Sequence, residues 1–337
     1  MKVSEFEYVL PPEAIAQSAL EPRHAARLLD TRDMSDHTFL DLPDLLEPSD
    51  LVVVNNTRVR AARLGGTRSG TGGRVELLLL DRLDDDTWEA LARPSRRLRP
   101  GVVIEFDDFT ATVLSVPEEG KLTVRLDTPD PEAAIARIGT VPLPPYFEGR
   151  LDTPERYQTV FAETPGSAAA PTAGLHFTDQ VTERLRARGI EIATVDLHVS
   201  LDTFRPMKVE NVEDHRMHSE WFSLPDATSE AIERIRASGG RVVAIGTTVV
   251  RALESMADGH GGVIAGERRT DLFLRPGVPI TVTDLLVTNF HLPGSTLLVL
   301  LAAFMGEGWR TAYQTALERG YRFLSFGDAM LAARAQT

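Results

Sequence analysis

A block of short β-rich segments interrupts a chain that elsewhere alternates helices and strands, and this limits the possible folds more than any other feature. Residues 51–54, Leu-Val-Val-Val, form an apolar run between polar residues, as expected of a strand buried on both faces. Glycine-rich loops follow at 65–66 and 70–73. Five short segments separated by turn residues come next: 74–80, 87–92, 102–106, 109–116 and 121–126. With a helix over 131–138 and a proline-rich stretch over 141–145, this spacing predicts a compact β barrel or sandwich at 65–150.

From about residue 165 the pattern changes to helices alternating with strands. Thr178 can cap a helix that stops at Gly189, and 190–199 and 242–245 are strand-like, with a helix starting at Thr228 or Ser229 between them. Such alternation favours a largely parallel sheet. We therefore predict an α/β fold. A large α/β domain with a mixed, barrel-like sheet, made of 1–64 and 151–337, carries an inserted small all-β barrel domain at 65–150.

Composition excludes several classes of protein. The chain has no cysteine, so disulfides, thiolate metal sites and a cysteine nucleophile are excluded. The first residues lack the apolar core of a secretion signal, and the longest apolar run, 297–305, is far shorter than the roughly 20 residues needed to span a bilayer. We expect a soluble, cytoplasmic protein without membrane association. The net charge of −13 disfavours a nucleic-acid binder overall, although arginines cluster over 58–74 and 93–99.

Two segments place small residues and hydroxyls at helix starts. One spans 166–177 and contains Thr172, Gly174 and His176, and its alternative interpretation is a packing turn with a buried histidine. The other follows the strand at 242–245 and reads Gly246-Thr247-Thr248, which suits contacts to phosphate, carboxylate or ribose. It lacks the glycine spacing of a dinucleotide or Walker loop, and an ordinary helix cap is its alternative.

Two further segments carry histidines beside other polar groups. His215, His218 and Glu220 lie within six residues, which suits proton transfer, a metal site completed by another histidine, or simple surface packing. Asn289 and His291 follow an apolar strand and precede a Pro-Gly turn, a common position for site residues. Residue patterns alone therefore indicate an α/β protein with a small-molecule pocket.

Taken in order, these segments resemble one family, the S-adenosylmethionine:tRNA ribosyltransferase-isomerases of queuosine biosynthesis. The resemblance runs through nearly the whole chain. Its most specific strings are Ala-Pro-Thr-Ala-Gly-Leu-His-Phe at 170–177 and Thr-Asn-Phe-His-Leu-Pro at 288–293. The other matching strings lie at 10–11, 15–17, 55–59, 142–146, 156–160, 215–220, 245–248 and 326–330.

The resemblance implies a reaction and a set of site residues. The family transfers the ribosyl carbons of S-adenosylmethionine to 7-aminomethyl-7-deazaguanine at the tRNA wobble position, forms an epoxycyclopentane and releases adenine and methionine. It implies no metal or other cofactor, and we expect a monomer that meets tRNA through arginines such as Arg58, Arg93, Arg96 and Arg97. For catalysis we predict His215, His218, Glu220 and His176. For substrate binding we predict Arg58, Thr172, Gly174, His198, Gly246, Thr247, Thr248, Asn289, His291 and Asp328.

The sequence also departs from the family pattern. The usual Arg-Asp-x-Ser-Arg is replaced by a string with His24 and Ala26, and two usual glycines are Ser200 and Asp202. Arg275 stands where an aromatic residue is usual. These changes favour one alternative, a paralogous enzyme that uses S-adenosylmethionine with another acceptor. A second alternative, independent of them, is a non-catalytic RNA- or nucleotide-binding protein on the same fold.

Overall fold

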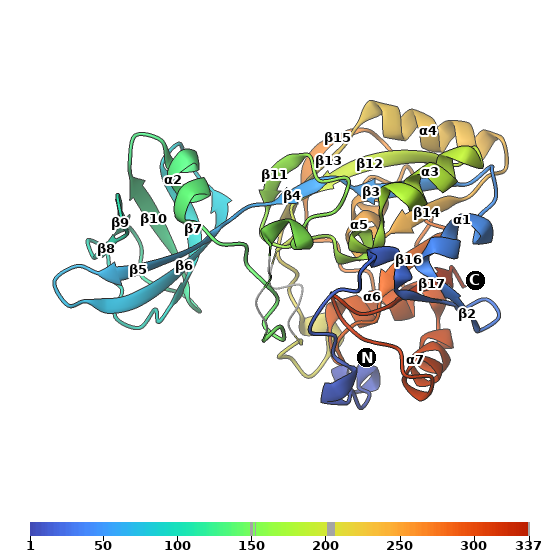
Figure 1. Ribbon diagram of the computed structural model, residues 1–337, viewed down its shortest axis with the longest axis horizontal. Coiled ribbons are helices and arrows are strands. Elements are labelled where there is room, and N and C mark those ends of the chain that lie inside the picture. The colour runs from blue at the N-terminus through green and yellow to red at the C-terminus, as the bar shows by residue number, and fades with distance from the viewer. Residues whose placement is uncertain (149–150, 152, 201–205, 336–337) are drawn as a thin grey trace. The chain divides into compact units, whose positions relative to one another are not determined.

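The computed structural model describes residues 1–148, 151, 153–200 and 206–335 (Figure 1). Contacts divide the chain into two units, Met1–Arg58 with Pro144–Thr337, and Val59–Leu143. The predicted domain limits, 1–64 with 151–337 and 65–150, lie a few residues later in the chain and stay a prediction.

The larger unit is built on one mixed sheet of nine strands. Their order is β15 (Gly266–Thr270), β13 (Glu220–Leu224), β12 (Glu191–Leu197), β3 (Leu51–Asn55), β14 (Val242–Ile245), β16 (Leu285–Asn289), β17 (Ala329–Ala333), β1 (Arg27–Asp30) and β2 (Ser35–Thr38). The central strands β12, β3, β14 and β16 are mutually parallel, with Val53 opposite both Ala193 and Ala244. β1 and β17 are also parallel, and the remaining pairs are antiparallel. The predicted α/β class with a mixed sheet is confirmed, although in the described residues this sheet ends at β15 and β2 and is open.

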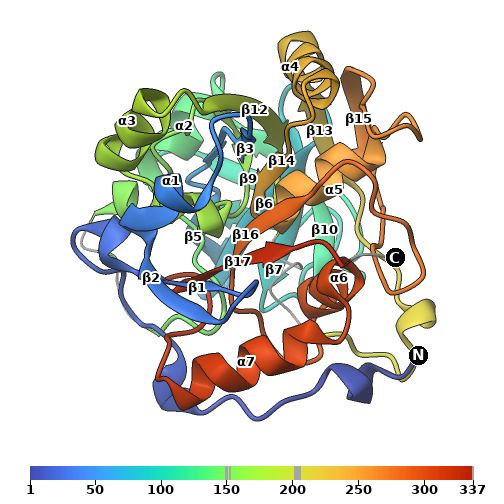
Figure 2. The ribbon, with the colours of Figure 1, turned by 90° about the vertical axis from the view of Figure 1, so that its right-hand side faces the viewer.

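β3 lies at the centre because both of its faces are apolar. Leu51 and Val53 pack into one core cluster, and Val52 and Val54 pack into a second. The first cluster contains side chains of α4 (Asp226–Ala237), α5 (Thr247–Ser255), α6 (Thr296–Met305) and α7 (Gly308–Glu318). The second contains those of α1 (Leu42–Leu45) and α3 (Asp179–Ala187). Helices therefore cover both sides of the sheet (Figure 2).

The smaller unit is a closed six-stranded barrel, as predicted. Its strands pair in the order β10 (Lys121–Asp127), β7 (Thr87–Arg93), β6 (Gly73–Arg82), β5 (Arg63–Arg68), β8 (Val103–Glu105) and β9 (Thr110–Val113), all antiparallel. β5 differs from the prediction, because Gly65 and Gly66 in the sequence indicate a loop. Gly66 is required inside the strand, since a Cβ there would lie 2.7 Å from the Glu105 carbonyl oxygen. Helix α2 spans Pro131–Ile138, as predicted.

Two helix starts differ from their predictions. Thr178 precedes α3 but makes no side-chain cap, because its hydroxyl is within 2.8 Å of His24 Nδ1. Helix α4 begins at Asp226, earlier than Thr228, whose hydroxyl donates to the Thr194 carbonyl of β12 at 2.7 Å.

The remaining elements are β4 (Thr57–Val59), β11 (Thr164–Ser167) and the 3-10 helices η1 (Val3–Phe6), η2 (Pro12–Ala14), η3 (Arg23–Ala25), η4 (Phe39–Asp41), η5 (Pro154–Tyr157), η6 (Thr172–His176) and η8 (Val212–Asp214). None of the helices in the described part of the chain is both long and apolar enough to cross a bilayer.

Candidate active site

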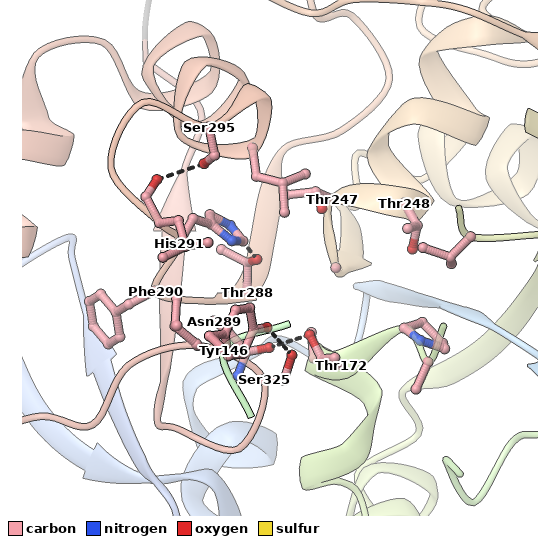
Figure 3. A pocket seen from close by; sticks show the side chains of 18 residues that line it. Tyr146, Thr172, Thr247, Thr248, Thr288, Asn289, Phe290, His291, Ser295 and Ser325 are labelled. Atoms are coloured by element: carbon pink, nitrogen blue, oxygen red, sulfur yellow. Dashed lines mark hydrogen bonds between the residues drawn. The ribbon is translucent and has the colours of Figure 1, made fainter. Parts of the chain in front are cut away.

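A cavity opens at the carboxyl ends of the parallel strands, where ligands bind in open α/β sheets (Figure 3). It has about 580 Å³ of empty space, counting its open mouth. Val199 after β12, Gly246 after β14 and Asn289 at the end of β16 line it together with residues of η6. The full lining is Tyr146, Ala170, Pro171, Thr172, Ala173, Val199, Gly246, Thr247, Thr248, Thr288, Asn289, Phe290, His291, Leu292, Ser295, Leu297, Leu324 and Ser325. We call this cavity the main pocket.

The turn from β14 into α5 presents backbone donors and hydroxyls to the main pocket. Gly246 has φ of +94°, a conformation that disfavours any side chain, and it lets α5 begin directly at Thr247. The positive end of the helix dipole therefore faces the cavity. Thr248 Oγ1 is buried and makes no hydrogen bond within the described residues. An unused hydroxyl at the start of a helix favours a polar ligand at this position.

Asn289 connects three segments beneath the main pocket. Its Oδ1 accepts a hydrogen bond from Thr172 Oγ1 at 3.0 Å, and its Nδ2 lies 3.1 Å from His176 Nε2. Nδ2 also donates to the Asp328 carbonyl oxygen at 3.3 Å. Because Asn289 is buried, these bonds fix η6 against the end of β16 and hold Thr172 at the cavity wall.

The two buried histidines of this region are neutral at physiological pH. Burial lowers the pKa of His291 to about 3 and that of His176 to about 4. His291 Nε2 lies 3.0 Å from the Thr288 hydroxyl, and the His291 backbone N–H donates to the Tyr313 hydroxyl at 2.7 Å. His291 lines the main pocket and can donate or accept a hydrogen bond there as a neutral imidazole.

The three residues predicted for proton transfer from 215–220 do not line the main pocket. His215 is half-buried with its ring 5.6 Å from that of Phe273, and burial together with the nearby His218 lowers its pKa. His218 is exposed. Glu220 is buried at the start of β13 and forms an ion pair with Arg251 of α5.

The Glu220–Arg251 ion pair connects α5 to the wall of the main pocket. Glu220 Oε1 accepts a hydrogen bond from the Ser200 backbone N–H at 2.8 Å, directly after the pocket residue Val199. Arg251 Nε donates to the Leu272 carbonyl oxygen at 3.2 Å. Ser200 is one of the positions that depart from the family pattern, and Asp202, the next such position, lies outside the described residues.

Five other predicted site residues also lie outside the lining of the main pocket: Gly174, His198, Arg58, Asp328 and His176, whose ring contacts the pocket residue Asn289. Gly174 packs inside η6, where a Cβ would lie 3.0 Å from Thr159 Cγ2. His198 stacks near Trp221 with ring centroids 4.6 Å apart, and Arg58 is partly exposed on β4. Asp328 is buried and accepts hydrogen bonds from the backbone N–H groups of Arg27 and Arg322.

Some residues of the main pocket are not predicted from the sequence. Tyr146 and Ser325 form a hydrogen bond of 2.5 Å at the cavity wall, although 179 residues separate them. Tyr146 ends the family-matching string at 142–146, and Ser325 directly precedes the one at 326–330. These strings are the sequence signal that could have pointed to the two residues. Within the described residues, no three His, Asp or Glu side chains are arranged to hold a metal ion.

Comparisons with known proteins point to one family. A model of the family described as queuosine biosynthesis protein matches residues 3–332. The chain is 49% identical to the S-adenosylmethionine:tRNA ribosyltransferase-isomerase of Moorella thermoacetica, over 98% of this chain and 99% of the relative. It is also 49% identical to the protein of the same name from Symbiobacterium thermophilum, with the same coverage. The crystal structure of S-adenosylmethionine tRNA ribosyltransferase from Thermotoga maritima matches with a TM-score of 0.54 and 35% identity, covering 97% of this chain and 99% of that one.

Proposed function

Since the chain belongs to the queuosine biosynthesis protein family, we propose that it is an S-adenosylmethionine:tRNA ribosyltransferase-isomerase. The enzyme transfers the ribosyl group of S-adenosylmethionine to 7-aminomethyl-7-deazaguanine at the wobble position of tRNA. The sugar rearranges to an epoxycyclopentane, and adenine and methionine are released. The full-length match to relatives of this name is the observation that carries the proposal.

The main pocket is the proposed site for S-adenosylmethionine. Thr172, Thr247 and Thr248 present hydroxyls to it, and the start of α5 adds backbone donors that suit a carboxylate or a ribose. Asn289 and His291 supply neutral hydrogen-bonding groups at the carboxyl end of the neighbouring strand β16. S-adenosylmethionine is consumed here as a co-substrate, with no resident cofactor.

Proton transfer is assigned to His215 and His218. A sulfonium acidifies the neighbouring carbon, so the reaction needs a base, and departing adenine needs an acid. An imidazole side chain can act as a base or as an acid. His176 and Glu220 are also predicted from the sequence to be catalytic. His176 contacts Asn289 and Glu220 pairs with Arg251, and these partners favour a positioning role for both residues. His218→Ala should retain its affinity for S-adenosylmethionine in calorimetry but turn over at least roughly 100-fold more slowly.

The decisive experiment combines the protein, S-adenosylmethionine and tRNA carrying the deazaguanine base. We expect release of adenine and a mass gain on the tRNA, and neither with tRNA that carries guanine at the wobble position. No adenine release under conditions where the Moorella relative is active would reject the function. We further propose that the enzyme works as a monomer in the cytoplasm, which light scattering and cell fractionation test.

A further inference from the structure

A second, smaller cavity lies beside the main pocket, and three arginines line it. Arg23 of η3, Arg156 of η5 and Arg322 meet there, and we call the cavity the arginine pocket. Ser325 lines both cavities, so they share a wall. The arginine pocket has about 270 Å³ of empty space, counting its mouth.

The guanidinium groups are held in place by backbone carbonyls. Arg23 Nη1 donates to the Gln158 carbonyl oxygen at 2.7 Å, and its Nη2 donates to that of Glu155 at 3.1 Å. Arg322 Nη1 donates to the Ser18 carbonyl oxygen at 3.3 Å. These bonds fix the positions of the positive charges before any ligand arrives.

Positive charge exceeds negative charge around the arginine pocket. Arg156 pairs with the exposed Glu21, and Arg322 pairs with the buried Asp328. Arg23 makes no ion pair within the described residues. Burial and the charge of Arg156 lower its pKa, and the charge of Glu21 offsets only part of this effect. An anion bound between Arg23 and Arg156 would relieve this repulsion.

The proposed substrates carry two kinds of anionic group, the methionine carboxylate of S-adenosylmethionine and the phosphodiesters of tRNA. The lining of the arginine pocket favours one of them. The described lining consists of Ala19, Leu20, Arg23, Ala26, Arg156, Leu175, His176, Arg322, Ser325, Phe326 and Gly327, with no carboxylate among them. The methionine end of S-adenosylmethionine carries an ammonium beside its carboxylate, and the three guanidinium groups of the arginine pocket would repel that ammonium. A phosphodiester carries only negative charge, and the guanidinium fork matches its oxygens.

We propose that the arginine pocket binds a backbone phosphate of the RNA substrate, an inference that rests on the proposed function. A phosphate held there fixes one nucleotide beside the main pocket, because Ser325 also bonds Tyr146 of that pocket. His176 lines the arginine pocket and lies 3.1 Å from Asn289 of the main pocket, which gives a second direct connection. Arg23, Arg156 and Arg322 thus act as positioning residues for the acceptor.

Arg156→Gln and Arg23→Gln test the proposal, with Arg186→Gln as the matched control. Arg186 is an exposed arginine near the end of α3, so its loss changes the net charge equally without touching the arginine pocket. We expect Arg156→Gln to weaken tRNA binding about tenfold and to lower the slope of log affinity against log salt by about one. Affinity for S-adenosylmethionine should stay unchanged in calorimetry, and the control should match the wild type in both assays. Arg156→Lys keeps the charge but not the fork, so it should recover part of the tRNA affinity.

Thermal unfolding of each variant identifies those that are folded, and only these enter the comparison. Weaker binding of S-adenosylmethionine with unchanged tRNA binding would overturn the proposal, because the pocket would then hold the methionine carboxylate. Unchanged binding of both substrates by folded Arg156→Gln and Arg23→Gln would overturn it as well. Adenine release by the wild type is scored separately, so the function can stand while this proposal fails. Equally, the salt-dependent loss of tRNA binding can be observed with a protein that releases no adenine.

Discussion

Replacing Glu220 by Gln should unfold the larger unit at a markedly lower temperature. The change preserves the volume of the side chain and an oxygen that can accept from the Ser200 backbone N–H, but it removes the negative charge beside Arg251. The two side chains are 3% and 4% exposed, so the arginine charge would stay buried without compensation. Removing one partner of such a pair costs about 3–5 kcal/mol, which corresponds to a fall of about 10 °C in the unfolding midpoint.

Scanning calorimetry measures this effect, and two further variants make it specific. Glu191→Gln breaks the exposed pair between Arg234 of α4 and Glu191 of β12 and should leave the midpoint almost unchanged. The double variant Glu220→Gln/Arg251→Met removes both charges. We expect it to recover at least half of the fall in unfolding midpoint that Glu220→Gln alone causes.

Turnover of the double variant shows whether Glu220 only anchors α5 or also takes part in proton transfer. If the carboxylate only anchors α5 to the pocket wall, a refolded double variant should keep turnover within about tenfold of the wild type. A loss of more than roughly 100-fold in a fully folded double variant would show that the carboxylate takes part in proton transfer. An unchanged midpoint for the single variant would refute the electrostatic reasoning itself.

Three further predictions concern the main pocket and the two buried histidines of this region. Thr248→Val should leave the unfolding midpoint unchanged or raise it slightly, because Oγ1 is buried without a partner in the described residues, yet calorimetry should show about tenfold weaker binding of S-adenosylmethionine. Thr172→Ala should instead lower the free energy of unfolding in urea by about 1 kcal/mol, because it removes the hydrogen bond to Asn289. It should also weaken binding of S-adenosylmethionine. Equal stability of the Thr248→Val and Thr172→Ala variants would contradict this prediction. The pKa values of about 4 for His176 and about 3 for His291 lie below that of the unfolded imidazole, so stability present above about pH 6.5 should be lost as the pH falls. His291→Gln should flatten the loss between pH 6.5 and 4, while the exposed control His260→Gln should retain it.

Local pattern predicted much of the fold but not its exceptions. The apolar run of β3 and the proline-led helix α2 were both recognisable, because burial on two faces and a fixed first turn leave direct signals in the sequence. β5 was missed because a glycine pair usually marks a loop. Gly66 is there for the close approach of β8, a contact between residues distant in sequence.

In the candidate site, too, the sequence predicts positions at strand ends but not contacts between residues that are distant in sequence. Gly246, Thr248 and Asn289 line one cavity, as expected of residues at the carboxyl ends of neighbouring parallel strands. The sequence grouped Glu220 with His215 and His218 because they are close along the chain. The structure gives Glu220 a partner on α5 instead, and only the packing of α5 against β13 reveals that partner.

The central position of β3 also sets the order in which the chain can fold during synthesis. β3 is translated before the barrel strands, yet its two neighbours, β12 and β14, are translated after them. The hairpins of the barrel join consecutive strands and can form while the ribosome is still translating the second half of the chain. β3 therefore stays unpaired until β12 has emerged and keeps one edge open until residue 245 has emerged, and this interval exposes the nascent chain to aggregation or to capture by a chaperone.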